Sequence, residues 1–88
     1  MKEPKTVIQE ILLTLIENGE VSIMDFPYLS GYRTRVSDLV LIHGLELAKM
    51  RETKINKYNN TYSYVVSILP ENQKSKAINL YNEMLSKN

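Results

Sequence analysis

The spacing of the hydrophobic residues changes along this chain of 88 residues, from a helical repeat to strict alternation. In the first part, residues three and four positions apart form one stripe, which consists of Ile8, Ile11, Leu12, Leu15 and Ile16. In the second part every other residue is hydrophobic, at Tyr62, Tyr64, Val66 and Ile68. The first spacing is typical of a helix with one buried face, and the second of a half-buried strand. The chain is therefore predicted to be α+β, mainly α with a small β-hairpin.

Glycine and proline residues mark the limits of the predicted helices. Three segments have helical spacing: residues 4–18, 33–43 and 71–87. Pro4 suits the first turn of the first helix, and Gly19 supplies its left-handed end. Gly31 favours a left-handed turn before the second helix, and Gly44 ends that helix. Pro70 is predicted to start the last helix.

The segment between the first two helices allows two interpretations. Ser22 and Asp25 have the spacing of a capping box, which predicts a helix start. Pro27 follows too soon, because proline in a helix interior removes a hydrogen bond and clashes with the preceding turn. Either a one-turn, kinked helix begins after Ser22, or a later helix is capped by Asp25.

The hairpin is predicted to begin at Leu45, because Leu45-Glu46-Leu47 already alternates. The phase of the alternation changes near Ala48, which a β-bulge would explain. The tip is predicted at residues 56–60, where Asn59-Asn60 tolerates the positive φ of a tight turn.

Composition restricts the chain to one small domain, since 88 residues have room for one hydrophobic core. The chain has no cysteine, which excludes disulfides and thiolate metal sites. It has no apolar run of membrane-spanning length and no signal-peptide core, so we expect a cytoplasmic protein. The net charge is −3 over residues 1–32, +3 over residues 33–57 and +1 over residues 58–88, which sum to +1. A binding surface is expected in the cationic middle third.

The order of these elements resembles the winged helix-turn-helix domain, as found in short phage-type helix-turn-helix proteins. The similarity extends from Thr6 to Leu69 and is strongest in four segments: Ile16-Glu17-Asn18-Gly19, Val21-Ser22, residues 29–39 and His43-Gly44-Leu45-Glu46-Leu47. It implies a winged helix-turn-helix domain over residues 1–69 with an added C-terminal helix over residues 70–88. It also implies that the helix at 33–43 enters the major groove and that a basic wing contacts the DNA backbone or minor groove. Two features depart from the family: Pro27 interrupts the supporting helix, and residues 40–43 are apolar where the family tends to carry Arg and Lys.

Ten polar residues are the candidate DNA contacts. Polar or cationic side chains near the N-terminus of a groove-bound helix can reach base edges. Here these side chains are Arg33, Thr34 and Ser37, while Arg35 is assigned to a phosphate. Either Arg33 or Arg35 could bond a guanine in bidentate fashion. The hairpin contributes six candidates for phosphates or the minor groove: Arg51, Lys54, Asn56, Lys57, Asn59 and Asn60. The alternative for both groups is an ordinary solvated surface.

Six hydrophobic residues are the candidate partner or dimer contacts. Leu41 and Ile42 lie off the core face of the second helix, and exposed apolar pairs often mark a partner surface. The last helix carries a stripe that includes Ile78, Tyr81, Met84 and Leu85. This stripe either docks on the first helix or pairs with its copy in a homodimer.

We therefore expect sequence-specific binding of double-stranded DNA by a transcriptional regulator or a phage or mobile-element accessory factor. The alternative is a protein–protein module, such as an adaptor or antirepressor, which reads no bases. Exposed Leu41 and Ile42 favour this alternative, as does Asp38, whose carboxylate would repel phosphate. An enzyme, a metal, a cofactor or a small-molecule substrate is not expected, because the chain has no phosphate-binding loop, Gly-rich fingerprint or Cys/His pair.

Overall fold

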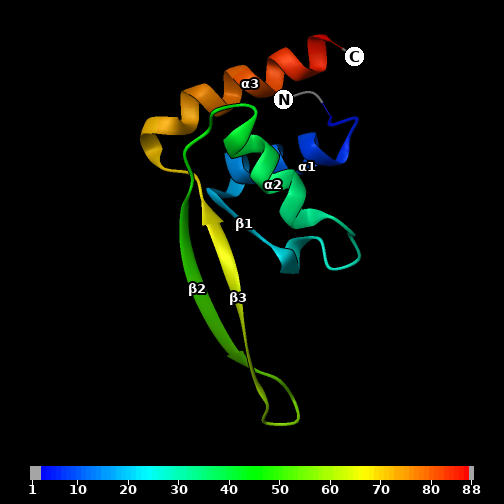
Figure 1. Cartoon of the computed structure of the whole chain (residues 1–88), viewed down its shortest axis with the longest axis vertical. Helices are drawn as coiled ribbons and strands as arrows, with labels where there is room; N and C mark the ends of the chain where they lie inside the picture. The colour runs from blue at the N-terminus through cyan, green and yellow to red at the C-terminus, as the bar shows by residue number, and fades with distance from the viewer. Residues whose placement is uncertain (1–2, 88) are drawn as a thin grey trace.

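The computed structural model of the chain describes residues 3–87, which form three α-helices and one antiparallel sheet (Figure 1). In chain order the elements are α1 (Val7–Asn18), β1 (Glu20–Ser22), η1 (Ile23–Asp25), α2 (Tyr32–Leu41), β2 (Ala48–Ile55), β3 (Thr61–Ile68), η2 (Glu71–Gln73) and α3 (Lys74–Ser86), where η denotes a 3₁₀ turn. The predicted α+β class is confirmed. The predicted domain over residues 1–69 and the predicted C-terminal segment over residues 70–88 include residues 1, 2 and 88, which lie outside the described part. Within that part, no helix combines the length and apolar character needed to cross a membrane.

The first helix and the turn after it follow from local capping. The Thr6 side chain accepts a hydrogen bond from the Gln9 N–H, so α1 begins at Val7, and the predicted start at Pro4 is wrong. The predicted end is confirmed, because Gly19 adopts a φ of +80°.

After β1, Ser22 and Asp25 form the predicted capping box, and the segment makes a single 3₁₀ turn. The one-turn interpretation is therefore confirmed, and the later helix capped by Asp25 is not formed. Pro27 lies beyond this turn and interrupts no helix.

The sheet has the strand order β1-β3-β2, and its long β2–β3 hairpin extends away from the helices (Figure 1). The two strands pair without interruption from Ala48↔Ile68 to Ile55↔Thr61, so the predicted bulge is absent from the described hairpin. The prediction that the first strand begins at Leu45 is also wrong. Leu45 is buried in the core instead, so its apolar character reflects packing near the helices.

The hydrophobic core forms where α1 packs against both α2 and α3. Ile11, Leu12 and Leu15 of α1 are completely buried. The stripe on α3 docks on the same core, where the side chain of Tyr81 has an exposed fraction of 0% and Leu85 is also buried. These two residues are therefore not available for the predicted pairing between copies. Ile78 and Met84 are partly buried against the same core.

Tyr32, the first residue of α2, is buried with a hydroxyl oxygen that has no hydrogen-bond partner among residues 3–87. Its ring stacks on Phe26 with centroids 6.2 Å apart. Burial, and secondly the negative charge of Asp25, raise the pKa of Tyr32 from 10.0 to about 12.

Tyr32→Phe is therefore expected to raise the free energy of unfolding by about 1 kcal/mol near neutral pH, because a buried hydroxyl without a partner costs roughly 1–3 kcal/mol. A pKa raised by folding contributes stability below the unfolded value of about 10, which is lost as the pH rises toward about 12. The variant should lose less stability over this range, although burial also raises the pKa of Tyr81. Urea unfolding at about pH 7 and about pH 11 measures both effects. Lower stability of the variant at the lower pH would contradict the prediction.

Candidate nucleic-acid interface

Helix α2 buries one face and presents a polar face to solvent. Tyr32, Val36 and Leu39 are its buried residues. The exposed residues include four of the predicted DNA contacts: Arg33, Thr34, Arg35 and Ser37. Gly31 precedes the helix with a φ of +81°, as predicted, and the helix ends at Leu41 rather than at the predicted position 43. The predicted groove-reading residues are thus accessible.

The two arginines of α2 lie on different sides of the helix. Each residue of an α-helix advances by about 100°, so Arg33 and Arg35 are separated by about 200°. The Nη1 atom of Arg35 lies 3.6 Å from Oδ2 of Asp38. The Arg35 guanidinium is therefore held beside a carboxylate, whereas Arg33 has no ion pair among the described residues.

A hollow of about 210 Å³ lies between α2 and the hairpin. From α2 it is lined by Arg33, Val36 and Ser37, and from the sheet by Lys49, Val65 and Ser67. Two cations from separate elements thus face one space.

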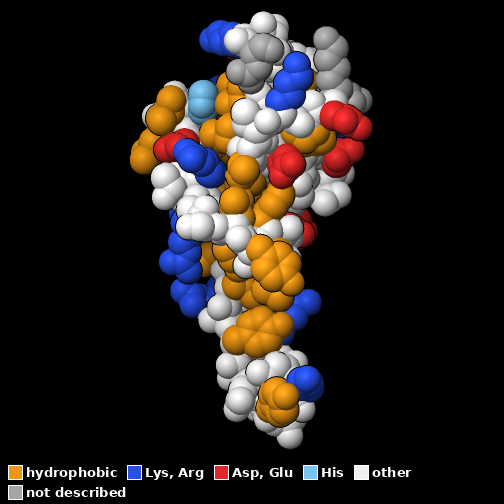
Figure 2. Space-filling view, turned by 90° about the vertical axis from the view of Figure 1, so that its right-hand side faces the viewer, with side chains coloured by type: hydrophobic (Ala, Val, Ile, Leu, Met, Phe, Trp, Pro, Cys, Tyr) orange, Lys and Arg blue, Asp and Glu red, His pale blue; other side chains and the backbone are white. Residues whose placement is uncertain are grey.

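Arg51 lies two residues after Lys49 and therefore on the same side of β2. Its Nη1 atom donates a hydrogen bond of 3.3 Å to Oγ of Ser63 on β3. We call Arg33 and Ser37 of α2, with Lys49 and Arg51 of β2, the basic face. Figure 2 shows Lys and Arg side chains gathered along one margin of the upper hairpin.

Lys54 lies on the opposite side of the sheet, because its position on β2 differs from that of Arg51 by an odd number of residues. It is paired with Tyr62 and shares a hollow of about 380 Å³ with Asp25 and Glu52. We call this side, with Glu52, Lys54, Tyr62 and Tyr64, the tyrosine face. The two tyrosine rings stack with centroids 6.2 Å apart, and Figure 2 shows hydrophobic side chains running down the hairpin. The structure therefore separates Lys54 from the predicted contacts Arg33, Ser37 and Arg51.

The hairpin tip uses some of the predicted contacts to form its turn. The Oδ1 atom of Asn56 accepts hydrogen bonds from the backbone N–H groups of Tyr58, at 2.9 Å, and Asn60, at 3.1 Å. Asn59 adopts the predicted left-handed conformation, with a φ of +62°. The Nζ atom of Lys57 lies 5.1 Å from the centroid of the Tyr58 ring. Asn56 and Asn59 thus have structural roles, and Lys57 is the exposed cation of the tip.

Lys49 is the residue of the basic face that the sequence did not single out. Its position opposite α2 depends on the phase of the alternation along β2, which the predicted bulge near Ala48 left open. The signal that could identify it is its two-residue spacing from Arg51, once the strand limits are known.

The predicted partner residues Leu41 and Ile42 are exposed at the C-terminal end of α2, with exposed fractions of 82% and 70%. No described element covers them.

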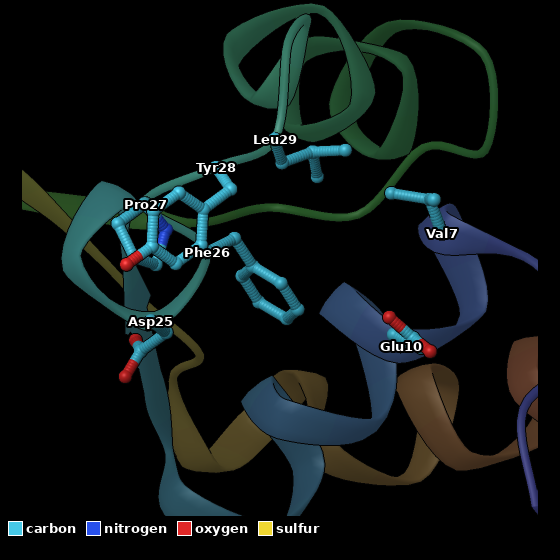
Figure 3. A pocket seen from close by; sticks show the side chains of 7 residues that line it. All are labelled: Val7, Glu10, Asp25, Phe26, Pro27, Tyr28 and Leu29. Atoms are coloured by element: carbon cyan, nitrogen blue, oxygen red, sulfur yellow. The ribbon is translucent and has the colours of Figure 1, made fainter.

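A further hollow, of about 350 Å³, lies between α1 and residues 25–29. Figure 3 shows the Phe26 ring directed toward α1, the helix that carries Glu10. None of the predicted DNA contacts lines this hollow. It is therefore separate from the basic face.

Comparison with known proteins gives no similarity from which a function can be transferred: no protein-family model matches the chain, and no curated protein or solved structure matches it significantly.

Proposed function

We propose that the chain is a winged-helix domain that binds double-stranded DNA, with α2 in the major groove and the β2–β3 hairpin as its wing. The observation that carries this proposal is the basic face, where Arg33 of α2 and Lys49 of β2 line one hollow. An exposed helix fits the major groove, which is about 12 Å wide, and the adjacent cations would neutralise phosphates. Arg51 continues the positive charge along the wing.

The two parts of this surface have different roles in the proposal. Arg33, Thr34 and Ser37 are exposed on α2 and contact base edges, where a bidentate arginine–guanine pair contributes roughly 1–3 kcal/mol of discrimination. Lys49 and Arg51 contact phosphates. Asp38, beside Arg35, accepts a hydrogen bond from the cytosine amino group or holds Arg35 in place.

The salt dependence of binding tests this proposal. If Lys49, Arg51 and Lys57 each neutralise one phosphate, log K should fall with log salt concentration with a slope of about −2.7, at about 0.9 per phosphate. Selection from random DNA duplexes at two salt concentrations should enrich a common sequence, and fluorescence anisotropy on that duplex gives the slope. A single strand of the same sequence is the control. Absence of enrichment, or a slope close to zero on an enriched duplex, would exclude the proposal.

A second candidate function, a protein–protein adaptor, is favoured by the exposure of Leu41 and Ile42 beside the acidic Asp38. Leu41→Ser separates the two functions, because it removes an apolar side chain from the pair and adds no charge to the exposed face of α2. A DNA-binding protein with this substitution should retain its affinity for the selected duplex. An adaptor should bind no duplex and should lose its purified partner.

A further inference from the structure

Strand β3 has one edge that is only partly covered. In the order β1-β3-β2, β1 pairs with the last three residues of β3, from Val66 to Ile68. Residues 61–65 therefore have a neighbouring strand on the β2 side only, and Figure 1 shows this lower part of β3 beyond the end of β1.

The hydrogen bonds at the two ends of β3 show which backbone groups point to this edge and have no partner strand there. The Leu69 N–H donates to the Gly19 carbonyl oxygen at 2.8 Å, on the side of β1. Backbone groups of a strand point to the same edge at every second residue. Thr61, Ser63 and Val65 therefore direct their N–H and C=O groups outward. The bond from the Asn56 N–H to the Asn60 carbonyl oxygen agrees, since it places the even-numbered residues of β3 toward β2.

The side chains of this edge do not prevent pairing with another strand. Residues 61–65 are Thr, Tyr, Ser, Tyr and Val; all but the serine favour strands, and none carries a charge. The opposite edge of the hairpin differs, because β2 carries Lys49, Arg51 and Lys54, and charged residues commonly block pairing at exposed strand edges. Of the two long edges of the hairpin, only that of β3 is both open and uncharged.

We propose that a second copy of the chain pairs with this edge, antiparallel and across a two-fold axis at Ser63. In this register Ser63 faces the partner's Ser63 and Thr61 faces the partner's Val65. The outward groups at 61, 63 and 65 then all obtain partners, because these are the hydrogen-bonded positions of the new ladder. The paired segment ends where β1 covers Val66 and where the hairpin turns at Asn60, so five residues of each copy fit.

This pairing has two consequences for the faces of the sheet. A two-fold axis perpendicular to the sheet keeps corresponding faces on the same side, so both basic faces point in one direction. On the other side, Tyr62 faces the partner's Tyr64, a cross-strand aromatic pair of the kind that stabilises sheets. The dimer would therefore join two copies of the proposed DNA surface, but its formation requires no DNA and is tested without it.

Sedimentation with a matched pair of charge variants tests the proposal. Ser63→Lys places two positive charges opposite each other at the two-fold axis. Thr53→Lys adds the same charge to the same face directly across the hairpin, because Thr53 pairs with Ser63. For the unchanged chain, the fraction of dimer should rise as the protein concentration increases from about 5 to about 200 μM. Ser63→Lys should weaken dimerisation at least about tenfold, and Thr53→Lys should have little effect. A monomer at every concentration, or equal effects of the two variants, would overturn the proposal.

Cross-linking provides a second test, which detects the paired dimer directly and does not require a substitution that weakens it. The chain has no cysteine, so Ser63→Cys introduces a single thiol. At a hydrogen-bonded pair the two Cα atoms are about 5.5 Å apart, within the range that a disulfide spans. Mild oxidation should convert Ser63→Cys to a disulfide-linked dimer at least about tenfold faster than Thr53→Cys. Equal rates for the two variants would exclude this register.

Discussion

Replacing Arg33 and Lys49 together with alanine is expected to weaken binding to the selected DNA duplex by about two orders of magnitude at physiological salt. The two side chains line one hollow from α2 and β2, so the double variant removes a proposed base contact and a proposed phosphate contact together. Loss of the base contact is worth roughly 1–3 kcal/mol, and each 1.4 kcal/mol is a factor of ten in affinity. Fluorescence anisotropy over a salt series measures the effect. The slope against log salt should become shallower by about 0.9, for the one phosphate contact of Lys49.

The control for this experiment is Lys54→Ala, which removes one positive charge from the tyrosine face of the same strand. It should reduce affinity by less than about threefold, because Lys54 shares its hollow with Asp25 and Glu52. If Lys54→Ala weakens binding as much as the double variant does, the protein responds to net charge alone. The docking of α2 and the basic face would then be rejected.

Tyr81→Ala is expected to lower the free energy of unfolding by about 3–5 kcal/mol, the range measured when buried aromatic residues are replaced by alanine. Its side chain is completely buried where α3 packs on α1. Small domains have a total stability of about 5–15 kcal/mol, so this single change removes a large part of it. Urea denaturation followed by circular dichroism measures the difference.

Asn82→Ala is the matched control, since the neighbouring Asn82 is exposed on the same helix. It should change the free energy of unfolding by less than about 0.5 kcal/mol. If the two variants had the same stability, α3 would be an appendage to the domain rather than part of its core.

The parts of the fold that sequence predicted well are those determined by local chemistry. The apolar stripe of α1, the capping box at Ser22 and the left-handed turns at Gly19 and Gly31 each depend on a few neighbouring residues. The same holds for the hairpin tip, where Asn59 adopts a positive φ.

The parts that sequence could not determine depend on contacts between distant segments. The spacing of apolar residues on α3 is the same whether the helix docks on α1 or on a second copy, so only the structure shows which packing buries Tyr81. The faces of the hairpin posed a different problem. A shift of one residue in a strand reverses the side of every side chain, and the predicted bulge near Ala48 left the sides of Lys49 and Lys54 unassigned. Sequence therefore provided candidate residues on the helix and on the hairpin, but not their division between two faces.

The molecule is elongated, about 46 Å along its longest axis, and both termini lie at the end opposite the hairpin tip (Figure 1). A fluorescent label, an affinity tag or a fused domain attached at either terminus would consequently project away from the hairpin tip. Immobilisation on a sensor surface through such a tag should leave the hairpin accessible to solvent.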